Sequence, residues 1–125
     1  MSPRLLLSRL AVTLAAAAVV LAVGCGEEDP RFAKLEGLAR EGYLVYKREC
    51  KVCHSMNAST DGPLGPPIAG ASIELLEARV LRLQYPPGYT PKRATRAMFP
   101  ALPHLAPKIP ALHAFLDPAL HPKPE

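Results

Sequence analysis

The chain has 125 residues, 15 of them basic and 11 acidic, for a formal charge of +4, and it contains 15 prolines but no tryptophan. This length accommodates one small domain. The basic residues are scattered, without a long Lys/Arg run or interleaved aromatic residues, which argues against a nucleic-acid-binding protein. Because proline is unfavourable inside helices and central strands, we expect turns and ordered loops in much of the second half.

Residues 1–24 have the layout of a secretory signal. Arg4 and Arg9 form a basic start, and an apolar run from Leu10 to Val23 follows. We therefore expect the chain to be exported, with residues 25–30 as a short polar tether.

The cysteine after this run is a candidate lipidation site. Leu21-Ala22-Val23-Gly24-Cys25 resembles a bacterial lipobox. The resemblance implies that Cys25 is lipidated and anchors the domain to the periplasmic face of a membrane. A retained anchor helix is the alternative, because the 14-residue apolar run is shorter than the roughly 20 residues of a full span but can be extended by its flanks. An unlipidated secreted form would leave Cys25 as a lone exposed thiol.

The next segment predicts an amphipathic helix. Apolar and small residues recur at steps of three and four, the spacing of one helix face. These residues are Phe32, Leu35, Ala39, Gly42 and Tyr46.

The stretch Cys50-Lys51-Val52-Cys53-His54 is typical of covalent haem attachment. Two thiols at this spacing can reach both vinyl groups of one haem, and the imidazole of His54 can bind the iron. A haem would also supply buried apolar mass to a small domain with 3 Phe and 4 Tyr.

Two alternatives to haem attachment fit these residues less well. A structural zinc site needs four nitrogen or sulfur ligands, and no cysteines beyond the leader lie outside this stretch. A thioredoxin-like dithiol needs a βαβ setting, whereas a helix is predicted before Cys50 and no strand pattern follows.

The residues that flank this stretch resemble the class I cytochrome c family. In that family the first helix carries a glycine eight residues, and an aromatic residue four residues, before the first motif cysteine. Gly42 and Tyr46 occupy those positions. Gly65-Pro66-Pro67-Ile68-Ala69-Gly70 is similar to the family's Gly-Pro-x-Leu-x-Gly loop. The resemblance implies that the carbonyl of Pro66 accepts the ring N–H of His54, which fixes the imidazole tautomer.

Two further helices are predicted. The first runs from Ser72 to Gln84, has Ser72 as its N-cap, and is expected to line the haem pocket. Its apolar face consists of Ile73, Leu76, Val80 and Leu83.

The second is a short closing helix from Pro107 to Leu116, which ends before Asp117-Pro118. The resemblance implies that it crosses the first helix near Gly42 and Tyr46, with Phe115 as its aromatic contact.

Met98 is the candidate for the sixth ligand of the iron. It follows His54 by 44 residues, in a stretch similar to the Met-Pro ligand turn of bacterial relatives. Met1 lies in the leader, and Met56 is too close to His54 to reach the opposite face of a haem. His104 is the second candidate, and an open coordination position is the third. We expect His113 and His121 to be surface residues.

Two sets of residues before Met98 have open roles. The cations Lys92, Arg93 and Arg96 could pair with haem propionates or bind an acidic partner, and plain solvation is an equally good interpretation. Likewise, Tyr85 and Tyr89 could reach a propionate or pack the loop.

The helical patterns predict an all-α protein, and the resemblance to class I cytochromes c implies a small cytochrome c fold. Three to four helices and proline-rich loops would surround one haem c across residues 31–118, followed by a tail at residues 119–125. The expected function is one-electron transfer without bond-making catalysis, as a carrier or as a subunit of a respiratory complex. Expected partners are a respiratory reductase, oxidase or dehydrogenase. The alternative is a haem-based sensor or ligand binder with an open sixth position.

Overall fold

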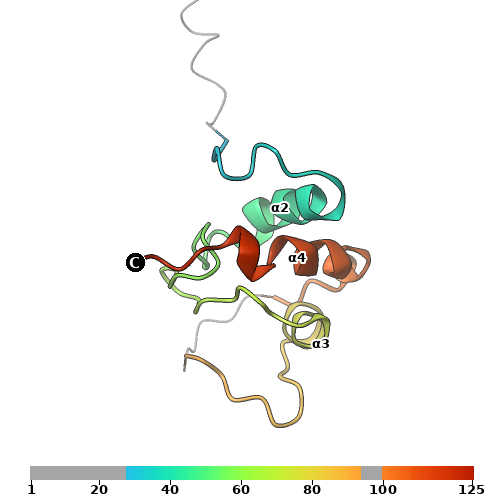
Figure 1. The fold of residues 1–125 in the computed structure, drawn as a ribbon. Helices are drawn as coiled ribbons and strands as arrows, with labels where there is room; N and C mark the ends of the chain where they lie inside the picture. The colour runs from blue at the N-terminus through green and yellow to red at the C-terminus, as the bar shows by residue number, and fades with distance from the viewer. Residues whose placement is uncertain (1–27, 94–99) are drawn as a thin grey trace, which may run out of the picture.

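The computed structural model describes residues 28–93 and 100–125, and within these ranges the chain is helical with no strand. The predicted all-α class is therefore confirmed for this part of the chain. The elements, shown in Figure 1, are α2 (Gly37–Glu49), α3 (Ile73–Leu76), the π-helix η1 (Glu77–Leu81), the 3-10 helix η2 (Pro103–Lys108), α4 (Ile109–Phe115) and the 3-10 helix η3 (Pro118–Leu120).

Helix α2 begins at Gly37, later than the periodicity predicted. Gly37 has a φ of +55°, which breaks the regular helical path toward the N-terminus. Phe32 and Leu35 therefore precede the helix, although Phe32 is completely buried. Their spacing reflects burial in a turn at the start of the domain.

Helices α2 and α4 pack directly against each other at Gly42, as predicted (Figure 1). A Cβ on Gly42 would lie 1.9 Å from the carbonyl oxygen of Ala111 and 2.8 Å from Cβ of Phe115, so the crossing requires glycine. The rings of Tyr46 and Phe115 have centroids 5.1 Å apart. The predicted crossing and its aromatic contact are confirmed.

An aromatic cluster forms the centre of the core around this crossing. Phe32 and Phe115 meet edge to face at 5.1 Å, and Tyr43 lies 5.3 Å from Phe32. Edge-to-face pairs add roughly 0.5–1.5 kcal/mol to the gain from burial alone. Apolar side chains from α4 and its flanks complete this core, namely Leu105, Ile109, Leu112 and Leu116.

The predicted helix from Ser72 to Gln84 begins correctly but ends early. The Ser72 hydroxyl accepts a hydrogen bond from the Leu75 N–H at 3.2 Å, which confirms the N-cap. The α-helix then gives way to η1, and Leu83 has a φ of +56°. The N–H of Leu83 donates to the carbonyl of Arg79. Glycine is the residue usually found where a helix ends in this left-handed conformation.

The closing helix is also shorter than predicted. Pro107 lies inside the 3-10 helix η2, and the α-helix begins only at Ile109, with Pro110 in its first turn. Pro110 lacks the N–H that a helix with an earlier start would need for its backbone hydrogen bonds. The helix ends before Asp117-Pro118, as predicted.

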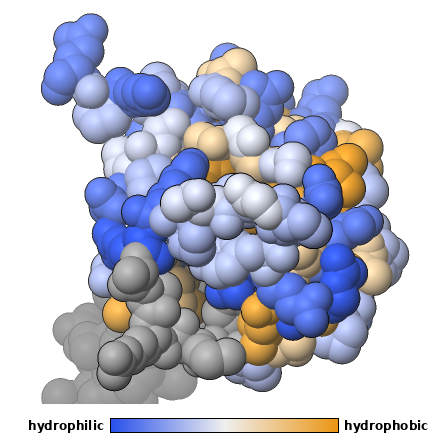
Figure 2. Space-filling view, turned by 90° about the horizontal axis from the view of Figure 1, so that it is seen from below, coloured by the Kyte–Doolittle hydropathy of each residue, from blue (hydrophilic) through white to orange (hydrophobic). Residues whose placement is uncertain are grey.

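In residues 28–93 and 100–125, no helix combines the length and apolar character needed to cross a membrane. The expected signal segment and Cys25 lie outside the described residues. On the face shown in Figure 2, hydrophobic side chains reach the surface in separate patches among hydrophilic ones.

Candidate functional site

The Cys-x-x-Cys-His residues lie at the C-terminal end of α2. Cys50 is the C-cap of this helix, and its N–H donates to the Tyr46 carbonyl at 2.9 Å. The chain then turns tightly, because the N–H groups of Cys53 and His54 both donate to the Cys50 carbonyl, at 3.1 and 2.9 Å. This turn brings the two cysteines and the histidine together beside one hollow in the fold.

The hollow consists of two cavities, a smaller one of about 120 Å³ and a larger one of about 270 Å³. Both are lined by Cys53, His54, Ile68 and Leu76. The larger cavity alone approaches the lower limit of about 300 Å³ that is common for cofactor sites. Leu75 and Leu76 of α3 and Arg79 and Val80 of η1 line these cavities, and this helix is the one that we expect to line a haem pocket.

His54 is held in one orientation by the loop that the sequence indicated. Its Nδ1 donates to the carbonyl oxygen of Pro66 at 2.9 Å, which confirms the predicted contact. This bond selects the tautomer that leaves Nε2 as the nitrogen able to bind a metal. Burial lowers the pKa of His54, with a smaller opposing effect from the bond to Pro66, so the imidazole is neutral near pH 7 and competent as a ligand.

Glycines complete the setting of His54, and the sequence alone did not identify this role. A Cβ on Gly65 would lie 2.4 Å from Cε1 of His54, and a Cβ on Gly62 would lie 2.3 Å from the carbonyl oxygen of Cys53. The Gly65 N–H donates to the same carbonyl at 2.8 Å. Glycine next to proline usually marks only a turn, so the sequence gives no signal of this close approach.

Cys50 and Cys53 are both free thiols, half-buried beside the cavities. Burial raises the pKa of Cys50 to about 12, and the neighbouring Glu49 and Cys53 add to the effect. A reactive dithiol requires a lowered thiol pKa, so Cys50 is protonated and a poor nucleophile at neutral pH. A thioether at this position would be uncharged and compatible with burial.

Among the described residues, no group of three or more His, Cys, Asp or Glu side chains could hold a metal ion. Cys50, Cys53 and His54 therefore do not converge as the three protein ligands of a chelated metal. An iron held mainly by a porphyrin needs only an axial imidazole from the protein.

Cations and aromatic rings line the smaller cavity. Lys92 and Arg93 both lie there, as does Arg79, which the sequence analysis had not singled out. Tyr85 and Tyr89 stack with centroids 5.4 Å apart, and the Arg79 guanidinium lies 4.3 Å from the centre of the Tyr85 ring. Arg93 also pairs with Asp61 at 2.5 Å. This end of the hollow is therefore suited to an anionic group.

Only one of the two axial-ligand candidates, Met98 and His104, lies in the part of the chain that the structure describes. Met98 falls outside it, as does Arg96. On either side of that undescribed stretch, Arg93 lines the smaller cavity and Pro100 lines the larger one. The alternative ligand, His104, is exposed in η2 and lines neither cavity.

The two histidines expected on the surface have different environments. His113 is exposed, as predicted, with Nδ1 3.0 Å from the Ala71 carbonyl oxygen. The prediction for His121 is wrong, because its side chain is buried and both ring nitrogens are hydrogen-bonded. A histidine in a short tail beside prolines has no periodic pattern that would indicate burial.

Comparisons with protein-family models, curated proteins and solved structures found no match to this chain. The side chains around His54 are therefore the basis for assigning a function.

Proposed function

We propose that this chain is a c-type cytochrome that binds one haem through Cys50 and Cys53 and transfers single electrons. The observation that carries the proposal is the geometry of His54. Pro66 holds its Nδ1, which leaves Nε2 as the ligand atom. The same ring lines both cavities together with Cys53, and Cys50 lines the larger one. A haem joined to both thiols would lie against the imidazole that binds its iron.

The chemistry of the cavity linings fits a haem. The larger cavity is lined mainly by apolar side chains, including Val80, Leu102 and Leu112, which suit a flat apolar ring. The smaller cavity adds cations and tyrosine rings, and Arg79 and Lys92 could neutralise the propionates. For Lys92 and Arg93, which line this cavity, the arrangement supports the propionate interpretation over plain solvation.

A bound haem supplies a reversible one-electron iron couple. The residues of this chain hold and tune that couple. The carbonyl of Pro66 increases the basicity of His54 by accepting its N–H, which favours the oxidised iron. Met98 is our proposed sixth ligand, and a thioether there would favour the reduced iron.

No bond-making role is proposed for these residues, because electron transfer needs an exposed haem edge and not an acid–base pair. Export and a lipid at Cys25 would hold the domain on the periplasmic face of a membrane. Confinement there raises its effective concentration near a respiratory reductase, oxidase or dehydrogenase.

The attachment chemistry can be tested by intact mass and colour of the exported protein. We expect red protein whose mass exceeds that of the polypeptide and any lipid by one haem, with pigment that survives acid–acetone extraction. Cys50→Ala and Cys53→Ala should each lose one thioether, and the double variant should lose the pigment. Lys51→Ala, between the two cysteines, is the matched control and should retain it. A colourless wild-type protein with the mass of bare polypeptide would overturn the proposal.

The sixth ligand requires separate variants. Met98→Ala should abolish the weak thioether-to-iron band at the red end of the visible spectrum, while His104→Ala should leave it unchanged. A spectrum unaffected by Met98→Ala would favour the open-site alternative, in which the iron binds nitric oxide or carbon monoxide.

A further inference from the structure

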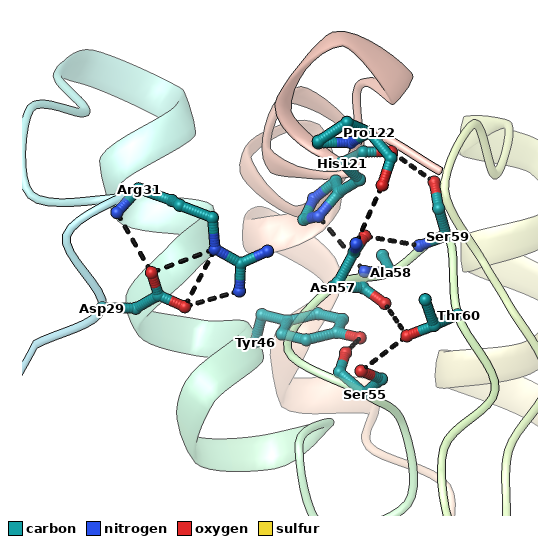
Figure 3. Close-up of polar contacts among 10 residues, drawn as sticks. All are labelled: Asp29, Arg31, Tyr46, Ser55, Asn57, Ala58, Ser59, Thr60, His121 and Pro122. Carbon is teal, nitrogen blue, oxygen red and sulfur yellow. Dashed lines mark hydrogen bonds and ion pairs between the residues drawn. The ribbon is translucent and has the colours of Figure 1, made fainter. Parts of the chain in front are cut away.

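The C-terminal tail is fixed to the loop that follows the haem-binding motif. Figure 3 shows the tail residues His121 and Pro122 beside the loop residues Asn57 to Thr60. The Asn57 amide donates to the Pro122 carbonyl at 2.9 Å, and the Ser59 hydroxyl donates to the His121 carbonyl. The tail therefore closes over a loop that lies more than sixty positions earlier in the sequence.

His121 occupies the centre of this contact, and only one protonation state satisfies it. The Ala58 N–H donates to Nδ1 of His121 at 3.2 Å, while Nε2 donates to the Phe115 carbonyl at 2.8 Å. Nδ1 must therefore be unprotonated and Nε2 protonated, which describes a neutral imidazole. A proton on Nδ1 would set N–H against N–H and place a charge in a side chain that is only 1 % exposed.

The surroundings of His121 oppose a positive charge. Its ring packs edge to face on Phe115 at 4.8 Å and lies at a tilt to the Phe32 ring at 5.6 Å, both distances between ring centroids. Burial lowers the pKa of His121, and Arg31 from the N-terminal turn lowers it further; the bond to Phe115 and the charge of Asp117 oppose the shift.

Arg31 is itself paired with Asp29 (Figure 3). The loop of residues 55–60 carries no charged side chain, and His113 of α4 is directed to the Ala71 carbonyl instead.

The loop held by His121 is connected to the proximal side of the candidate haem site. The Ala58 carbonyl accepts hydrogen bonds from the N–H groups of Ile68 and Ala69, at 2.8 and 2.9 Å. Ile68 and Ala69 directly follow Pro66 and Pro67, and the carbonyl of Pro66 accepts the hydrogen bond from His54. The N–H of Ala58 therefore contacts the His121 ring, and the carbonyl of Ala58 contacts the segment whose Pro66 holds His54.

A second connection reaches the loop from α2. The Tyr46 hydroxyl donates to the Ser55 carbonyl at 2.7 Å, next to His54 (Figure 3). This bond holds the start of the loop to α2 and does not involve the tail.

We propose that His121 is a pH-responsive latch, a positioning residue whose neutral ring holds the tail and Ala58 in place and whose protonation releases them and loosens the support of His54. The latch itself stands on the described contacts. Its effect on a haem potential rests on the function proposed above.

The latch is tested by hydrogen exchange of the Ala58 amide in the full exported protein. The latch is closed above the ordinary His pKa of about 6.5. Below that pH the released ring takes up a proton, so the equilibrium constant for opening the latch should rise by up to about tenfold per pH unit. The protection factor of Ala58, corrected for intrinsic exchange, should therefore fall as the pH is lowered from about 7 to about 5, by up to about tenfold per pH unit. A pH-independent protection factor in the wild-type protein would overturn the proposal.

Matched variants separate the latch from general acid effects. His121→Gln keeps a neutral amide that cannot titrate, so the pH dependence of Ala58 protection should disappear, whereas His121→Lys should expose Ala58 at every pH. His113→Gln, at the exposed histidine of α4, should behave as the wild-type protein. Should His121→Gln fail to fold, the wild-type profile decides alone.

The coupling to the haem is measured by the midpoint potential. Loosening the Pro66 carbonyl makes His54 a poorer donor to iron, so the wild-type midpoint should rise more steeply on acidification than that of His121→Gln. Equal slopes of midpoint potential against pH in the wild-type protein and His121→Gln would refute the coupling to the haem. The latch itself would then be tested by the hydrogen exchange of Ala58 alone. A colourless protein would instead refute the haem proposal, and Ala58 exchange would still report on the tail.

Discussion

Gly65 packs against the ring of His54 so closely that a side chain would collide with it. A Cβ there would lie 2.4 Å from Cε1 and 2.5 Å from Nδ1 of His54. The backbone of Gly65 cannot retreat freely, because its N–H is held by the carbonyl of Cys53. We expect Gly65→Ala to displace the imidazole and reduce the fraction of exported protein with a wild-type visible spectrum. Pro63→Ala, at an exposed position of the same loop, should leave the spectrum unchanged; a wild-type spectrum in Gly65→Ala would contradict this account.

Gly42 poses the same steric problem between two helices. Alanine has the higher helix propensity, by about 1 kcal/mol, so Gly42→Ala would stabilise an uncrowded helix. Here the new methyl group meets backbone atoms of Ala111, which cannot move without separating α2 from α4. We expect the free energy of unfolding to fall by about 1–3 kcal/mol in urea denaturation. Leu44→Ala, on the exposed side of α2, should change it by less than about 0.5 kcal/mol.

At the residue scale, positions at fixed distances from the motif were predictable. Gly42, Tyr46 and Pro66 make the contacts that the resemblance to the class I cytochrome c family implied for these positions. His121 was not predictable, because its burial depends on a tail folding back over a distant loop.

At the scale of elements, the order of the helices was predictable but their lengths were not. The periodicity predicted that Phe32 lies in a helix. It lies instead in a buried turn, which can produce the same three- and four-residue spacing. The segment after Ser72 carries a good helical pattern to Leu83, yet the structure widens into a π-helix and ends with Leu83 in a left-handed conformation. A leucine gives no stop signal, since glycine is the residue that normally marks this position.

The N-cap of α3 matters because this helix has only four residues before the π-helix. The Ser72 hydroxyl satisfies the Leu75 N–H at 3.2 Å. We expect Ser72→Ala to lower the free energy of unfolding by about 1 kcal/mol, and Ser72→Asp, which can also cap, to retain most of it. Equal losses in the two variants, measured by urea denaturation, would show that the hydroxyl bond is not the source of stability.

At the scale of the whole molecule, a small core borders the hollow beside His54. Several of its buried hydrophobic side chains are alanines, and the aromatic cluster lies at the α2–α4 crossing, on one side of the motif. The larger cavity is bordered by Leu76, Leu112 and Leu116, which are core residues as well as lining residues. The same side chains belong to the core and would contact a bound haem, so cofactor binding and folding should be coupled.

This coupling predicts that the chain without haem is poorly folded. A domain of this size buries limited apolar surface, and a ligand bound only by the native state adds directly to the stability of that state. We expect the Cys50→Ala/Cys53→Ala double variant to lose much of its helical circular dichroism and its cooperative thermal transition, while Lys51→Ala retains both. Adding free haem should restore part of the helical signal, because His54 and the apolar lining remain. A double variant that unfolds cooperatively at the wild-type melting temperature would show that α2, α3 and α4 form a self-sufficient core, and that the hollow beside His54 is not completed by a cofactor.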